Sequence, residues 1–107
     1  MKILFDQSTP RPLKNYLYPH VVTTSFQMKW GAKENGDLIG AAEAAGFDLL
    51  ITADKNWKYQ QNLSGRKVAI IVLMVNDWKK IQPSVGLVQD AVAKVAAGSF
   101  IEVEFPE

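Results

Sequence analysis

The chain has 107 residues, of which 48% are hydrophobic and 21% are charged, and its formal net charge is +1. This composition is typical of a globular protein with one core, and the weak net charge means that any basic surface must be local. The lack of cysteine and the single histidine exclude disulfides, thiolate metal sites and zinc sites built from several histidines.

The first part of the chain predicts two strands joined by a helix. Residues 2–5 are mainly apolar, as in a central parallel strand, and Asp6 closes this run. A turn with two prolines then leads into a helix. The buried face of that helix is predicted to carry Leu13, Tyr16 and Leu17. The β-branched residues that follow predict a second strand over 20–25.

The next part of the chain predicts a helix and a strand after a polar loop. The helix is expected over 36–45, with Asn35 as a suitable N-cap and Asp37 in the first turn. A short apolar run then predicts a buried strand over 48–52. Asp54 lies just beyond the carboxyl end of that strand, where ligands bind in open parallel sheets.

The last part of the chain predicts two further strands and a helix. Residues 68–74 are the most apolar segment and predict a buried strand. A helix is predicted over 83–97, with Gly98 as its stop. Alternating apolar and acidic residues then predict an edge strand over 100–105. The whole pattern predicts one α/β domain over 1–107, a three-layer α/β/α sandwich with a mainly parallel central sheet.

Three acids are predicted to face the same edge of this sheet. Asp6 and Asp54 follow two strands, and Asp37 begins the helix between them. Clustered carboxylates repel one another, and a divalent cation with a preference for oxygen ligands, Mg²⁺ or Mn²⁺, relieves that repulsion. The alternative is that these residues only make turns and caps, which are common after strands.

Three short motifs follow one another along the chain. The first is a strand that ends in an aspartate and precedes two prolines, Ile3-Leu4-Phe5-Asp6 with Pro10 and Pro12. The second and third are Gly36-Asp37-Leu38-Ile39 at a helix start and Thr52-Ala53-Asp54-Lys55-Asn56-Trp57 at a strand end. This combination resembles the PIN-like nuclease domains, specifically the short branch related to the VapC toxins and the Mut7-C domain.

The resemblance implies a catalytic metal site. Its implied metal ligands, which are also its implied catalytic residues, are Asp6, Asp37 and Asp54. Thr52 would orient this cluster through its hydroxyl. Asn56 stands where many members of the family have a further acid, and an amide oxygen can bind a metal without adding charge, which favours one metal over two. Glu34 competes with Asp37 for the place of the second acid.

Basic and aromatic side chains near the predicted rim are candidates for contacts with RNA. Lys33 and Lys55 could hold phosphates, and Trp30 could stack on a base. The alternative is an ordinary solvated surface for the lysines and a place in the core for the tryptophan.

The resemblance implies a metal-dependent endoribonuclease that acts as the toxin of a toxin–antitoxin pair. Its implied partners are RNA, a cognate antitoxin protein and a second copy of the chain. One alternative is a non-catalytic PIN-like binding module, which the amide at Asn56 favours. Another is a phosphoacceptor domain, but such domains normally have two acids after the first strand, and here Gln7 follows Asp6. No apolar run resembles a signal peptide or a membrane span, so a cytoplasmic location is expected.

Overall fold

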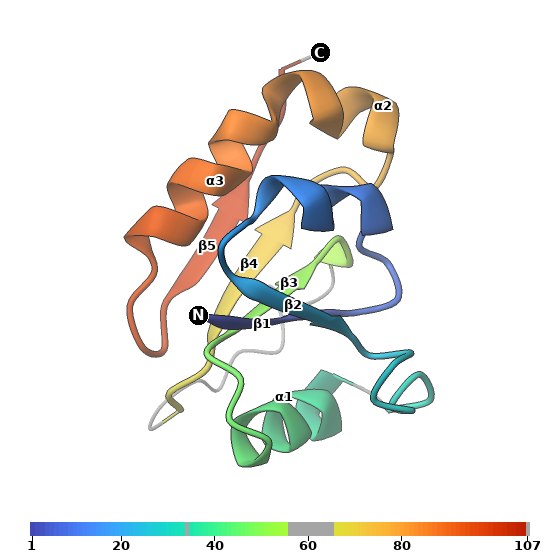
Figure 1. Ribbon diagram of the computed structural model, residues 1–107, viewed down its shortest axis with the longest axis vertical. Helices are drawn as coiled ribbons and strands as arrows, with labels where there is room; N and C mark the ends of the chain where they lie inside the picture. Colours follow the sequence, from blue (N-terminus) through green and yellow to red (C-terminus); the bar gives the residue numbers. More distant parts are fainter. Residues whose placement is uncertain (34, 56–65, 107) are drawn as a thin grey trace.

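The computed structural model describes residues 1–33, 35–55 and 66–106, and these contain a five-stranded sheet in which all strands are parallel (Figure 1). The strands are β1 (Lys2–Phe5), β2 (Val21–Thr24), β3 (Leu49–Thr52), β4 (Ala69–Leu73) and β5 (Phe100–Val103). They lie in the order β2-β1-β3-β4-β5. The five predicted strands and the parallel sheet are therefore confirmed.

Helical elements cover both faces of the sheet. They are η1 (Arg11–Tyr16), α1 (Asn35–Ala44), α2 (Trp78–Ile81), η3 (Gln82–Ser84) and α3 (Val85–Lys94). In Figure 1, α1 lies on one face, and η1, α2 and α3 lie on the other. This arrangement is compatible with the predicted α/β/α sandwich. None of the helices among the described residues is long and apolar enough to cross a membrane.

The period of two along each strand divides the core between the two faces. Ile3 and Phe5 of β1 belong to the hydrophobic cluster under η1 and α3, whereas Leu4 belongs to the cluster under α1. All three side chains are fully buried. β1, β3 and β4 are apolar on both sides because they lie inside the sheet. At the edge, β5 keeps the predicted alternation, with Val103 buried and Glu102 exposed.

The boundaries of α1 and α3 and one side chain differ from the sequence predictions. The helix α1 spans Asn35–Ala44, one residue earlier at each end than predicted, so Asn35 is its first residue. The helix α3 begins at Val85, after the 3₁₀ turn η3, instead of residue 83. It ends at Lys94 instead of residue 97, because Val95 is extended, with φ −64° and ψ 143°. Tyr16 is 37% exposed instead of buried, and its ring lies 5.6 Å from that of Trp78 at the surface.

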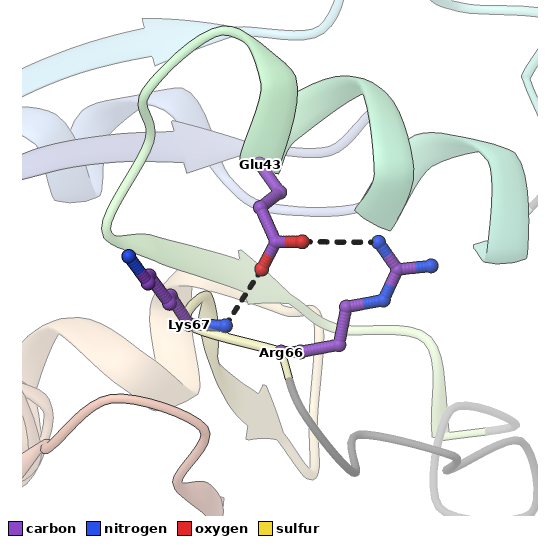
Figure 2. A network of polar contacts seen from close by, with 3 residues as sticks. All are labelled: Glu43, Arg66 and Lys67. Carbon is purple, nitrogen blue, oxygen red and sulfur yellow. Dashed lines mark hydrogen bonds and ion pairs between the residues drawn. The ribbon is translucent and has the colours of Figure 1, made fainter.

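A polar network fixes α1 to the chain that enters β4 (Figure 2). Glu43 accepts a hydrogen bond of 2.6 Å from the backbone N–H of Lys67 and an ion pair of 3.2 Å from the Arg66 guanidinium. The Lys67 bond is the main reason that the pKa of Glu43 lies below its ordinary value; partial burial opposes the shift, and Arg66 adds to it. The charged form of Glu43 therefore helps to hold α1 against the sheet.

Candidate functional site

The strand order places a crevice at the carboxyl ends of β1 and β3. From β1 the chain moves to one side to form β2, and then crosses to the other side to form β3. In open α/β sheets, ligands bind where the strand order reverses in this way. Asp6 follows β1, and its N–H donates to the carbonyl of Ile51 in β3 at 3.3 Å. The predicted acids Asp6 and Asp54 therefore flank this reversal point.

A set of hydroxyl groups surrounds the Asp6 carboxylate. Its Oδ1 accepts hydrogen bonds from the Ser8 N–H at 3.1 Å, the Ser8 hydroxyl at 2.7 Å and the Thr9 hydroxyl at 3.0 Å. Its Oδ2 accepts a hydrogen bond from the Thr52 hydroxyl. All of these partners donate, so the carboxylate is held in one orientation by residues from both strand ends.

The same hydroxyl groups also fix the backbone after β3. The Ala53 N–H donates to Ser8 Oγ at 2.9 Å, and the Asp54 N–H donates to Thr52 Oγ1 at 3.0 Å. The single hydrogen of the Thr9 hydroxyl is shared between Asp6 Oδ1 and the carbonyl oxygen of Ile51, which lies at 2.7 Å. Thr9 and Thr52 are buried, at 5% and 0% exposure, so their hydroxyl groups lie away from bulk water. The network therefore sets the positions of both Asp6 and the Asp54 backbone.

Two hollows flank the reversal point. The smaller, of about 220 Å³, is lined by both acids, Asp6 and Asp54, and by Trp30 and Lys33. The larger, of about 600 Å³, lies at the carboxyl ends of β3 and β4. Ser8 and Asp54 line both hollows, so the two share a wall.

The structure brings together some of the predicted site residues. Asp6, Thr52 and Asp54 lie at the reversal point, as predicted. Asp37 is exposed in the first turn of α1, and its neighbour Leu38 lines the smaller hollow. No three His, Cys, Asp or Glu side chains within residues 1–33, 35–55 and 66–106 are grouped so that they could hold a metal ion. The structure therefore gathers two of the three predicted acids.

The remaining predicted residues divide into those that the structure places and those that it does not. Glu34 and Asn56 lie outside the described residues. Lys33 is exposed at the smaller hollow, and Lys55 is exposed at the larger one. Trp30 is half-buried, because its ring packs edge-on against Phe47 with 6.2 Å between the ring centres.

The sequence analysis missed two groups of residues at this site. Ser8 and Thr9 make most of the hydrogen bonds to Asp6, and their spacing from Asp6 in the sequence could have predicted these bonds. Hydroxyl side chains two and three residues after an aspartate commonly bond back to it in a turn. Asn76 and Lys80 line the larger hollow. They could not be found in this way because only the folded sheet brings β4 beside β3.

The side chains at the reversal point offer oxygen atoms, which Mg²⁺ prefers as ligands. Oδ1 of Asp6 already accepts several hydrogen bonds, whereas Oδ2 accepts one from the described residues, so Oδ2 keeps a lone pair. Mg²⁺ usually binds proteins through one or two carboxylates and fills its other positions with water and substrate phosphate. Asp6 and Asp54 place two carboxylates at one hollow, which is the number that this mode of binding uses.

The chain matches no protein-family model, no curated protein and no solved structure.

Proposed function

We propose that the protein is a ribonuclease that uses Mg²⁺ or Mn²⁺ to hydrolyse RNA phosphodiester bonds at the reversal point. The observation that carries this proposal is that Asp6 and Asp54 follow β1 and β3, adjacent strands, and line one hollow together with Lys33. Acids at this position fit a metal, and the lysine supplies a positive charge for the phosphate that an RNA strand would bring.

Each residue of the site has a distinct role in this proposal. Asp6 Oδ2 and the Asp54 carboxylate would hold the cation, and the Ser8 and Thr52 hydroxyls keep the Asp6 carboxylate in one orientation. Lys33 binds a substrate phosphate. A bound Mg²⁺ or Mn²⁺ lowers the pKa of a bound water and neutralises charge on the phosphate under attack.

The family resemblance extends this proposal to the biological setting. It implies that the ribonuclease is the toxin of a toxin–antitoxin pair, bound by its antitoxin or by a second copy of the chain. Phe26 is 68% exposed beside the reversal point, with the Arg11 guanidinium 5.5 Å from its ring centre, and offers an apolar contact for such a partner. Co-purification with the product of a neighbouring small gene, or a dimer in light scattering, would support this extension.

A non-catalytic PIN-like binding module is the second candidate. Two observations favour it: Asp37 is not grouped with Asp6 and Asp54, and donors from the protein itself surround Asp6. In this case the hydroxyl network serves stability, and the hollows bind RNA without cutting it. Metal binding and cleavage distinguish the two candidates.

A phosphoacceptor domain is a third candidate, because the strand order β2-β1-β3-β4-β5 is also that of doubly wound folds that carry acids at this edge. Gln7 stands where such a site would have a second acid after β1, which makes this candidate weaker. Transfer of a phosphoryl group from acetyl phosphate to Asp54 would favour it over the ribonuclease.

The deciding experiment compares RNA cleavage and Mn²⁺ binding in the wild type and in charge-removing variants. Asp54→Asn should reduce cleavage by more than the roughly 10- to 100-fold typical of residues that only support a metal ligand. Asp90→Asn, an exposed acid on α3, is the matched control and should cleave as the wild type does. Cleavage that persists in EDTA, or an Asp54→Asn protein as active as the wild type, would refute the proposal.

The same experiment tests the third acid that the family resemblance implies, Asp37 or Glu34. Asp37→Asn and Glu34→Gln are measured side by side. The sequence register predicts a larger loss of cleavage for Asp37→Asn than for Glu34→Gln. A larger loss for Glu34→Gln would assign this role to Glu34, and no loss in either variant would leave Asp6 and Asp54 as the acids of the site.

A further inference from the structure

The larger hollow has a composition that the catalytic proposal does not explain. Its volume of about 600 Å³ is in the range of small-molecule sites, and its apolar surface comes from Ala53, Met74 and Val75. Two exposed lysines, Lys55 and Lys80, and two aspartates, Asp54 and Asp77, also line it. The Asp77 carboxylate is engaged as the N-cap of α2, where it accepts a hydrogen bond from the Lys79 N–H. Apolar surface beside the lysine side chains suits a ligand that has both an organic part and an anionic part.

The position of this hollow relates it to the proposed reaction site. It meets the smaller hollow at Ser8 and Asp54, so a ligand in it would touch the wall of the proposed reaction site. The smaller hollow has its own lysine, Lys33, on the other side. A polymer that crosses the reversal point would therefore meet a cation in each hollow, whereas a small substrate would need only one of them.

We propose that the larger hollow is a nucleotide subsite, which takes the nucleotide next to the scissile phosphate on the side away from Lys33. The orientation of the RNA strand in this inference rests on the proposed function, whereas the class of ligand, a nucleotide, rests on the lining of the hollow alone. Lys80 pairs with a phosphate of the strand, and the base or ribose lies against Met74 and Val75. Met74 and Val75 offer no hydrogen-bonding group that could read a base edge, so the subsite accepts any nucleotide of a single strand.

The two consecutive lysines of α2 give a matched test. Lys79 and Lys80 are both exposed and carry the same charge, but only Lys80 lines the hollow. Lys79 contributes its backbone N–H to the Asp77 cap at 3.0 Å, and alanine keeps that group. The variants Lys80→Ala and Lys79→Ala therefore change the net charge equally, but only Lys80→Ala changes a residue that lines the hollow.

The binding experiment uses a fluorescein-labelled single-stranded RNA of about ten nucleotides in EDTA, with anisotropy recorded over a range of salt concentrations. Lys80→Ala should weaken binding about fivefold and reduce the slope of log affinity against log salt by about 0.7. Lys79→Ala should leave both unchanged, and Lys80→Arg should restore them. Equal effects of Lys79→Ala and Lys80→Ala, or no RNA binding by the wild type, would overturn the inference.

Adenosine 5′-monophosphate distinguishes a subsite for a strand from a site for a free nucleotide. It should compete with the labelled RNA only at much higher concentration, because it fills one hollow instead of two. Competition at the same concentration as the RNA would overturn the assignment to a strand.

A cleavage assay in Mg²⁺ separates this inference from the proposed function. Lys80→Ala should raise KM and change kcat less, because the residue binds substrate away from the metal. If the wild type cleaves RNA and Lys80→Ala has the same kcat/KM, the subsite is refuted and the ribonuclease stands. If binding depends on Lys80 and no cleavage occurs in any metal, the subsite stands and the ribonuclease is refuted.

Discussion

The Thr52 hydroxyl at the end of β3 donates a hydrogen bond to Asp6 Oδ2 beyond the end of β1, across 46 residues of sequence. The bond joins the two strands between which the strand order reverses. It also fixes Asp54, because the Asp54 N–H donates to the same hydroxyl oxygen. One buried threonine therefore sets the position of both acids that we propose as metal ligands.

Replacing Asp6 with asparagine should lower stability as well as remove activity. The carboxylate accepts hydrogen bonds from Ser8, Thr9 and Thr52, and the amide NH₂ of asparagine would face at least one of these donors. The free energy of unfolding should fall by about 1–3 kcal/mol. Thermal melting in EDTA measures this effect without a metal. An Asp6→Asn protein that melts above the wild type would show that repulsion among acids outweighs these bonds.

Replacing Ser8 with alanine should loosen the site without removing an acid. The change removes a donor to Asp6 and leaves the Ala53 N–H without its acceptor, which should cost about 1–2 kcal/mol. Ser84→Ala is the control, because the Ser84 side chain makes no capping bond at the start of α3. Urea denaturation of the two variants should show a lower midpoint for Ser8→Ala only.

Glu43 should make stability depend on acid pH. Its pKa is lower in the folded protein than its ordinary value, mainly through the Lys67 N–H and also through Arg66. The stabilisation is complete above the ordinary pKa of glutamate and is lost as the pH falls through the lowered pKa. Melting temperatures measured from neutral to acid pH should therefore drop less steeply for Glu43→Gln than for the wild type. Parallel curves would contradict this assignment.

Two glycine substitutions should change stability in opposite directions. Gly98 has φ +75°, and a Cβ there would lie 3.0 Å from the carbonyl oxygen of Arg66, so Gly98→Ala should cost about 1–2 kcal/mol. Gly86 is helical in α3 and has open space around its Cβ position, so Gly86→Ala should stabilise by about 0.5–1 kcal/mol. Denaturant midpoints of the two variants test both signs together.

Strands were predictable from the sequence, whereas helix ends were less so. The runs Ile3–Phe5 in β1, Leu49–Ile51 in β3 and Ala69–Leu73 in β4 contain no polar residue, and such uninterrupted apolar runs are typical of central parallel strands. The end of α3 is different, because Lys94 to Gly98 have no strong local stop before the glycine. Only the return of the chain to β5 decides where that helix ends.

The acids of the candidate site were more predictable than their surroundings. Asp6 and Asp54 follow apolar runs, so a parallel sheet brings them to one edge. The order β2-β1-β3 depends on which strands pair, and local patterns do not encode pairing. The expectation from the sequence was mutual repulsion among acids, with Thr52 as an orienting residue. The structure surrounds Asp6 with hydroxyl donors: Ser8 and Thr9 are close to it in the sequence, whereas the contact between Ser8 and Thr52 requires the paired strands.

Because all strand pairs in the described sheet are parallel, none of these neighbours is joined by a hairpin. Each pairing requires a long stretch of chain to close first, and chains of this kind fold slowly, in about milliseconds to seconds. A nascent chain that has emerged only as far as β2 contains Asp6 but lacks β3, the other strand that pairs with β1. The nuclease activity that we propose should therefore appear abruptly during synthesis, once the segment with Thr52 and Asp54 has left the ribosome and paired with β1.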